Sequence, residues 1–126
     1  AEDGIRDVAV TGVQTCALPI CWREFASVVA LKDLRELFAV TGAADAVLCN
    51  DTGVAHVAAA LGKRVVSVFT ASEPDWFAPW GNRERVVRQP VCPHHPCLGR
   101  CVMSSVICRE AVTFEMVAAK VREAMR

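Results

Sequence analysis

Short apolar runs alternate with helical patterns along most of the chain. Residues 27–29 contain two adjacent valines and predict a short strand. Between Leu31 and Phe38, large apolar side chains recur at three- and four-residue spacing, and charged side chains lie between them. This pattern predicts an amphipathic helix whose apolar stripe belongs to the core. Gly42 is the expected end of this helix.

A second group of elements follows directly. Residues 46–49 (AVLC) are wholly apolar, as expected of a strand that is covered on both faces. Residues 54–61 are rich in alanine and predict a helix that ends at Gly62. Residues 64–69 (RVVSVF) predict another buried strand, so the segment should form a βαβ unit with parallel strands. The expected fold class is α/β, with a parallel sheet and flanking helices.

The rest of the chain is less regular. Residues 70–82 contain prolines and two tryptophans and predict a loop, whose indoles either stack on a ligand or pack on the sheet. Residues 84–88 predict a short edge strand, and residues 90–108 show no period. Residues 113–125 predict a closing helix with Thr113 as its N-cap. Its apolar stripe comprises Phe114, Val117, Val121 and Met125. Three arginines near the edge strand either meet an anionic acceptor or membrane surface or are simply solvated: Arg83, Arg85 and Arg88.

The first twenty residues are expected to be artificial. They read AEDGIRDVAVTGVQTCALPI and resemble the translation of a sequencing-library adapter. The alternative is a genuine strand–turn–strand segment, because Val8, Val10 and Val13 are compatible with one. We favour the adapter origin and exclude residues 1–20 from the fold expectations. The remaining residues, 21–126, are then expected to be the C-terminal piece of a longer protein.

Composition narrows the classes of function. Hydrophobic residues make up 53% of the chain and charged residues 22%, which is typical of a packed domain. No apolar run reaches the roughly 18 residues that a membrane span needs. The 14 basic residues balance 14 acidic ones, which argues against a nucleic-acid partner. The seven cysteines do not form a regular secreted framework, so we expect a cytoplasmic protein with reduced thiols.

Residues 50–56 (NDTGVAH) carry the candidate chemistry. They join a predicted buried strand to a predicted helix, at the strand end where open α/β sheets bind ligands. The amides and dipole of a helix N-terminus favour an anion, and Gly53 has no Cβ to keep a diphosphate away. His56 lies one turn into the helix. The alternative is that Asp51 or Thr52 only caps the helix and His56 is an ordinary surface histidine.

A longer string of motifs starts at this loop. Asp, Thr and Gly are followed by a His three residues later, a small-residue helix, a glycine, a strand and a loop with Pro and Trp. In this order the sequence resembles the nucleotide-sugar-binding domain of glycosyltransferase family 9, the lipopolysaccharide heptosyltransferases and their relatives. The likeness covers about residues 29–81. The residues in register are Asp51, Thr52, Gly53, His56, Ala58, Ala59, Ala60, Gly62, Pro74, Trp76, Pro79 and Gly81.

This resemblance implies a Rossmann-like domain that forms the C-terminal half of a two-domain GT-B glycosyltransferase. It implies transfer of a sugar from a nucleotide-sugar donor, ADP-heptose, to the lipopolysaccharide core, with inversion at the anomeric carbon and without a metal or other cofactor. Thr52 and Gly53 would hold the diphosphate, Asp51 the heptose hydroxyls, and His56 would lie beside the phosphates. The general base belongs to the N-terminal domain in the family, so none is expected within residues 21–126. The enzyme would be cytoplasmic, with any peripheral contact at the cytoplasmic face of the inner membrane.

Two other functions fit parts of the pattern. The same half-domain could serve another sugar-nucleotide enzyme such as an epimerase, because a fold does not fix a reaction. A non-enzymatic α/β module stabilised by zinc is the second alternative. Its candidate ligands are Cys92, Cys97, Cys101 and Cys108, with His94 and His95 close by. The spacing C-x4-C-x3-C-x6-C lacks the paired CxxC of zinc ribbons, so reduced thiols without a metal are preferred over zinc, and zinc over a disulfide.

Overall fold

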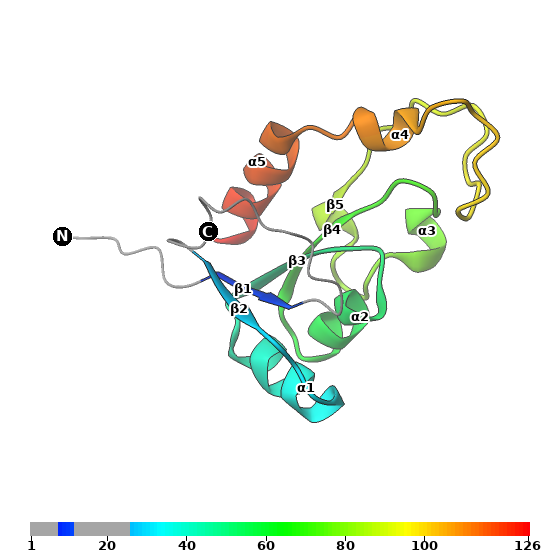
Figure 1. The fold of residues 1–126 in the computed structure, drawn as a ribbon. Coiled ribbons are helices and arrows are strands. Elements are labelled where there is room, and N and C mark those ends of the chain that lie inside the picture. The colour runs from blue at the N-terminus through cyan, green and yellow to red at the C-terminus, as the bar shows by residue number, and fades with distance from the viewer. Residues whose placement is uncertain (1–7, 12–25) are drawn as a thin grey trace. The chain divides into compact units, whose positions relative to one another are not determined.

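The computed structural model describes the backbone of residues 8–11 and 26–126, and the side chains from residue 29 onward. The chain divides into two compact units, residues 1–39 and 40–126. Figure 1 shows the elements in chain order. They are β1 (Val8–Thr11), β2 (Ala26–Val29), α1 (Leu34–Ala43), β3 (Ala46–Asn50), α2 (Gly53–Ala60), β4 (Arg64–Val68), α3 (Pro74–Phe77), the 3-10 turn η2 (Arg83–Arg85), β5 (Val86–Val87), α4 (Ile107–Glu110) and α5 (Phe114–Ala124).

In the first unit, β1 and β2 form a parallel pair in which Val8 lies opposite Ala26. β2 confirms the strand predicted at residues 27–29. β1 lies within residues 1–20, the segment that was excluded from the fold expectations. A strand conformation does not show where a sequence comes from, so the adapter origin of this segment stays a prediction.

α1 begins three residues after Leu31, where the predicted stripe starts, because Asp33 caps it. Asp33 Oδ1 accepts hydrogen bonds from the backbone amides of Arg35 and Glu36, at 2.8 and 3.0 Å. An aspartate cap followed by a glutamate three residues later is a strong start signal for a helix. The helix runs through Gly42 and ends one residue after the expected stop.

The stripe of α1 is less buried than predicted. Leu34 and Phe38 are exposed, whereas Thr41, one turn further on, is buried. Leu34, Phe38 and Thr41 share a face at helical spacing, so packing on this face is concentrated at the C-terminal end of the helix. The prediction that the whole stripe from Leu31 to Phe38 is core is therefore wrong.

The second unit is built on a parallel sheet in the order β3-β4-β5. β3 and β4 are in register from Ala46 opposite Arg64 to Asn50 opposite Val68. α2 connects them, which confirms the predicted βαβ unit. As predicted, Gly62 stops the helix, which ends at Ala60. Gly62 has a φ of +70°, and its amide donates a hydrogen bond to Ala59 O at 2.9 Å.

Helices cover both faces of this sheet: α2 lies on one face and α5 on the other (Figure 1). Alternate residues of β4 point to opposite faces, so Val65 packs with α2 and Val66 with α5. The α2 cluster contains Val47, Cys49, Ala55, Ala58, Ala59 and Val65. The α5 cluster contains Val66, Val68, Val87, Val112, Met116, Val117, Val121 and Ala124.

Leu48 corrects the expectation that the strand at residues 46–49 is covered on both faces. It lies opposite Val66 in the register and therefore on the α5 face, yet it is 54% exposed. β3 is an end strand of the three-stranded sheet, and the apolar side chains of α5 pack over β4 and β5. The apolar run identified a strand correctly, but its position in the sheet leaves Leu48 outside the packed cluster.

The remaining elements largely follow the predictions. β5 lies within the edge strand predicted at residues 84–88 but is shorter, because Glu84 and Arg85 belong to η2 and the strand ends at Val87. α5 begins after Thr113, whose Oγ1 accepts from Met116 N at 3.4 Å, as expected for its N-cap. The ends of its stripe, Phe114 and Met125, are exposed and do not join the core.

The loop after β4 contains an element that the sequence did not predict. α3 occupies residues 74–77, with Pro74 at its first position and Glu73 as its N-cap. Pro74 and Pro79 are buried, whereas Trp76 is exposed and Trp80 is 92% exposed. The loop is therefore packed by its prolines, and the alternative in which the indoles pack it on the sheet is wrong.

The second unit thus has an α/β fold, a parallel sheet with flanking helices that is consistent with a Rossmann-like domain. Within residues 8–11 and 26–126, every helix is too short or too polar to cross a bilayer.

Candidate functional site at the end of β3

Asp51 follows the last residue of β3 at the carboxyl end of the sheet. Its amide donates to Val68 O at 3.2 Å, which ties the start of the loop to the end of β4. α2 begins two residues later at Gly53, with Thr52 as its N-cap. The strand-to-helix turn predicted at residues 50–53 is therefore present.

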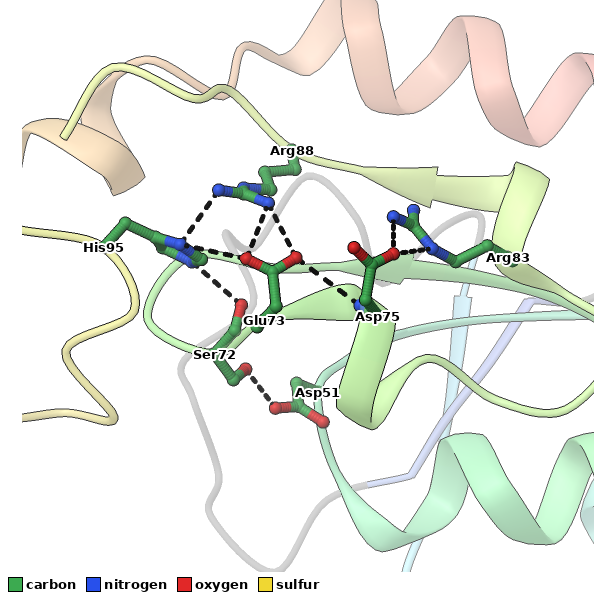
Figure 2. Close-up of polar contacts among 7 residues, drawn as sticks. All are labelled: Asp51, Ser72, Glu73, Asp75, Arg83, Arg88 and His95. Carbon is green, nitrogen blue, oxygen red and sulfur yellow. Dashed lines mark hydrogen bonds and ion pairs between the residues drawn. The ribbon is translucent and has the colours of Figure 1, made fainter. Parts of the chain in front are cut away.

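The side chains of this turn do not cap the helix. Thr52 makes no side-chain cap bond, and its Oγ1 lies 3.4 Å from Asn50 O, to which it donates. The Asp51 carboxylate turns to the neighbouring loop, where Oδ2 accepts a hydrogen bond from the Ser72 hydroxyl (Figure 2). The alternative that Asp51 or Thr52 serves only as a cap is therefore wrong.

A cavity of about 390 Å³ opens beside Asp51, at the ends of β3 and β4. Its size is that of a small-molecule site. Its lining residues are Asn50, Asp51, Val68, Thr70, Ala71, Ser72, Arg109 and Val112. The sequence predicted Asp51 but missed Ser72 and Arg109, because both come from segments that only the fold brings to this strand end.

The other predicted donor-binding residues lie outside this lining. Thr52, Gly53 and His56 are all exposed, with His56 one turn along α2. Among the described residues, no atom outside its chain neighbours and its own helix lies within 4 Å of a Cβ built on Gly53, so these residues leave the space in front of the first turn of α2 open. The structure thus places Asp51 in the cavity and leaves the start of α2 accessible beside it.

Cys49 lies two residues before Asp51 and is partly buried against α2. Burial raises the pKa of its thiol to about 11, the Asp51 carboxylate adds to the rise, and a hydrogen bond with Thr52 opposes it. Desolvation and a nearby negative charge both disfavour a thiolate. Cys49 is therefore a neutral core residue, in agreement with its position in an apolar strand.

A second polar cluster holds the loop that carries Ser72 (Figure 2). Arg88 Nη1 donates to both oxygens of Glu73, at 3.1 and 3.3 Å. His95 joins them: its Nδ1 lies 2.9 Å from Arg88 Nη2 and its Nε2 lies 3.0 Å from Ser72 O. Arg88 just after β5, Glu73 at the α3 N-terminus and His95 of the cysteine-rich segment therefore meet next to Ser72.

Comparison with known proteins identifies the family. The family model for glycosyltransferase family 9 (heptosyltransferase) matches residues 12–106, which is most of the chain. The chain belongs to glycosyltransferase family 9. The matched range includes the whole Asp51 turn, the Ser72 loop and the cysteine-rich segment as far as residue 106.

Two curated relatives are named heptosyltransferases. Lipopolysaccharide heptosyltransferase 2 of Salmonella typhimurium and that of Escherichia coli are each 36% identical to this family 9 chain over 55 residues. The matched segment covers 44% of this chain and 16% of each relative. No solved structure gives a significant match.

The arginines of this family 9 chain near β5 are all paired with carboxylates. Arg83 bonds to Asp75, Arg85 to Glu84, and Arg88 to Glu73. Charges that are neutralised locally contribute little to a field that would attract an anionic surface. The alternative in which these three side chains meet an anionic acceptor is not favoured.

The cysteine-rich segment of the family 9 chain surrounds a second, very small cavity of about 10 Å³. Its lining includes all four zinc candidates, Cys92, Cys97, Cys101 and Cys108, together with His94 and His95. The five cysteines from residue 29 onward carry free thiols. In the described ranges, no three Cys, His, Asp or Glu side chains are grouped closely enough to hold a metal ion.

Proposed function

We propose that this chain supplies the donor-binding part of a heptosyltransferase, which transfers heptose from ADP-heptose to a sugar of the lipopolysaccharide core. The observation that carries the proposal is the Asp51 carboxylate, directed into an open cavity beside the uncapped first turn of α2. The relatives named lipopolysaccharide heptosyltransferase 2 support the sugar and the acceptor. In this proposal the domain is the C-terminal half of a GT-B enzyme at the cytoplasmic face of the inner membrane.

The start of α2 suits a diphosphate. The first amides of a helix have no partner within the helix, and the peptide dipoles add partial positive charge. The Thr52 side chain does not bond to these amides, and among the described residues Gly53 leaves the approach to them open. We therefore assign diphosphate binding to Thr52 and Gly53. His56 lies on the next turn of α2, where a ring N–H would add a donor toward the same anion.

The cavity suits the sugar. Carboxylates accept hydrogen bonds from hydroxyl groups, so Asp51 provides the acceptor that orients the heptose. Ser72 fixes the carboxylate through its hydroxyl. Arg109 lines the same cavity and brings a positive charge that would offset the negative charge of the donor.

This arrangement favours departure of the nucleotide. Cleavage of the sugar–phosphate bond develops negative charge on the leaving ADP, and preorganised N–H donors stabilise that charge more in the transition state than in the ground state. Inversion at the anomeric carbon also needs a base that deprotonates the acceptor hydroxyl. We assign this base to a part of the enzyme other than residues 21–126, so this chain should bind the donor without turning it over.

Gly53→Ala tests the assignment in the 126-residue chain. Outside its chain neighbours and its own helix, the new methyl group meets no atom of the described residues within 4 Å and should leave folding intact, but it occupies the approach to the α2 amides. We expect calorimetric titration to show the affinity for ADP reduced by roughly tenfold, which corresponds to about 1.4 kcal/mol. Gly42→Ala is a matched control, because Gly42 is also helical and its Cβ position is also empty.

Equal ADP affinities for wild type, Gly53→Ala and Gly42→Ala would contradict the diphosphate assignment. Tighter binding of UDP or GDP than of ADP would contradict the assigned donor and leave the family unchanged. Measurable heptose transfer by this chain alone would contradict the assignment of the base to another part of the enzyme.

A further inference from the structure

Residues 95–98 brace the loop that follows β4. Cys97 N and Leu98 N both donate to Ala71 O, at 3.1 and 3.0 Å. The next carbonyl, Ser72 O, lies 3.0 Å from His95 Nε2. Two consecutive carbonyl groups of the loop are therefore held by one short stretch of the cysteine-rich segment.

Both ring nitrogens of His95 have partners in this network. A carbonyl oxygen only accepts hydrogen bonds, so Nε2 facing Ser72 O must carry the proton. The other ring nitrogen, Nδ1, lies 2.9 Å from Arg88 Nη2. The ring is therefore held at both nitrogens, by the Ser72 carbonyl at Nε2 and by Arg88 at Nδ1.

The ring is also held in place by burial and charge. The His95 side chain is only 8% exposed, and Glu73 Oε2 lies 3.4 Å from its Nδ1. Arg88 is fixed in turn by its two bonds to Glu73. Among the described residues Arg88 Nε is buried without a hydrogen-bond partner, so Arg88 is held through its two Nη atoms.

The carbonyl held by His95 belongs to the residue that contacts Asp51. The Ser72 hydroxyl donates to Asp51 Oδ2, so Ser72 links His95 to the carboxylate that lines the cavity (Figure 2). We propose that His95 is a positioning residue for sugar recognition, which acts through Ser72 to set the orientation of the Asp51 carboxylate. The inference rests on the proposed function and extends it to a side chain outside the cavity lining.

A positioning role predicts a selective loss. Asp51 is assigned to the sugar and the α2 amides to the diphosphate, so disturbing Asp51 should weaken ADP-heptose binding and spare ADP. A purely structural role would weaken both ligands alike. The ratio of the two affinities, measured by calorimetric titration of the 126-residue chain, separates these roles.

The variants are Ser72→Ala, His95→Leu and His95→Gln, with His94→Leu as a matched control. His94 is the exposed neighbour of His95 and lies outside the described hydrogen bonds. We expect Ser72→Ala and His95→Leu to lower the preference for ADP-heptose over ADP by roughly tenfold, at unchanged ADP affinity. His95→Gln keeps an N–H for the Ser72 carbonyl and should restore part of the preference. His94→Leu should behave as wild type.

Retention of the wild-type preference by His95→Leu overturns the inference, and so does an equal loss for both ligands. If His95→Leu does not fold, Ser72→Ala and His95→Gln decide the question by the same ratio. A wild-type chain that binds neither ligand overturns the proposed function together with the inference. A wild-type chain that prefers ADP-heptose while all three variants keep that preference overturns the inference alone.

Discussion

Cys49 shows how the charge of Asp51 acts on the packed strand beneath it. Burial and the nearby carboxylate raise the pKa of its thiol from 9.0 to about 11. The folded chain therefore holds this proton to a higher pH than the unfolded chain does. The resulting contribution to stability is complete below about pH 9 and is lost as the pH rises from 9 to 11.

We predict that the free energy of unfolding of the wild type falls more steeply between pH 9 and 11 than that of Cys49→Ala. Denaturant titration at several pH values measures both slopes, and all other titrating groups are shared by the two proteins. Parallel slopes would contradict the prediction, because they would show that the thiol has the same pKa in the folded and the unfolded chain. A second readout is alkylation at pH 8, where Cys49 should react more slowly than the exposed Cys101.

Two threonines at helix starts differ in what their hydroxyls do. Thr113 Oγ1 accepts from Met116 N and caps α5, whereas Thr52 makes no such bond at the start of α2. We predict that Thr113→Ala lowers the free energy of unfolding by about 1 kcal/mol. Thr52→Ala should cost about 0.3 kcal/mol or less, since it removes no cap. Equal losses in urea unfolding would mean that the α2 amides are capped by Thr52 after all.

Elements with a strong local signal were predicted well. β3 and β4 are apolar runs, α2 is alanine-rich with a glycine stop, and α5 has both a cap and an apolar stripe. The failures have local causes as well. The Asp33 cap sets the start of α1 more firmly than the apolar pattern does, and Pro74 in its first turn starts α3 instead of preventing a helix.

The site was predicted only as far as it is contiguous in sequence. Asp51 and the start of α2 follow from the strand-to-helix turn. Ser72 lies 21 residues from Asp51 and meets it only because β3 and β4 end side by side. His95 comes from the irregular segment and Arg109 from the short helix α4, and no periodicity specifies the path of either, so their places next to this turn required the fold.

At the scale of the whole molecule, the cysteine-rich segment is held to the β4 loop by hydrogen bonds. We predict that a strong chelator leaves the melting temperature of the purified chain unchanged, because the free thiols of the described residues are not grouped as metal ligands. Differential scanning calorimetry with and without EDTA measures this. Zinc in stoichiometric amount by elemental analysis, or melting at a lower temperature with chelator, would favour the zinc-stabilised alternative.

The empty space around Gly53 separates two reasons for keeping a glycine. Gly62 and Gly81 have φ values of +70° and +69°, so any copy of this fold needs them to make its turns. Gly53 has no such backbone requirement, and in the part of the chain that the structure describes nothing beyond its own helix and chain neighbours crowds it. A homologue that no longer binds the ligand would therefore tolerate other residues at position 53 but would still need glycine at positions 62 and 81. Sorting homologues by which glycines they retain would distinguish those that still bind from those that merely fold.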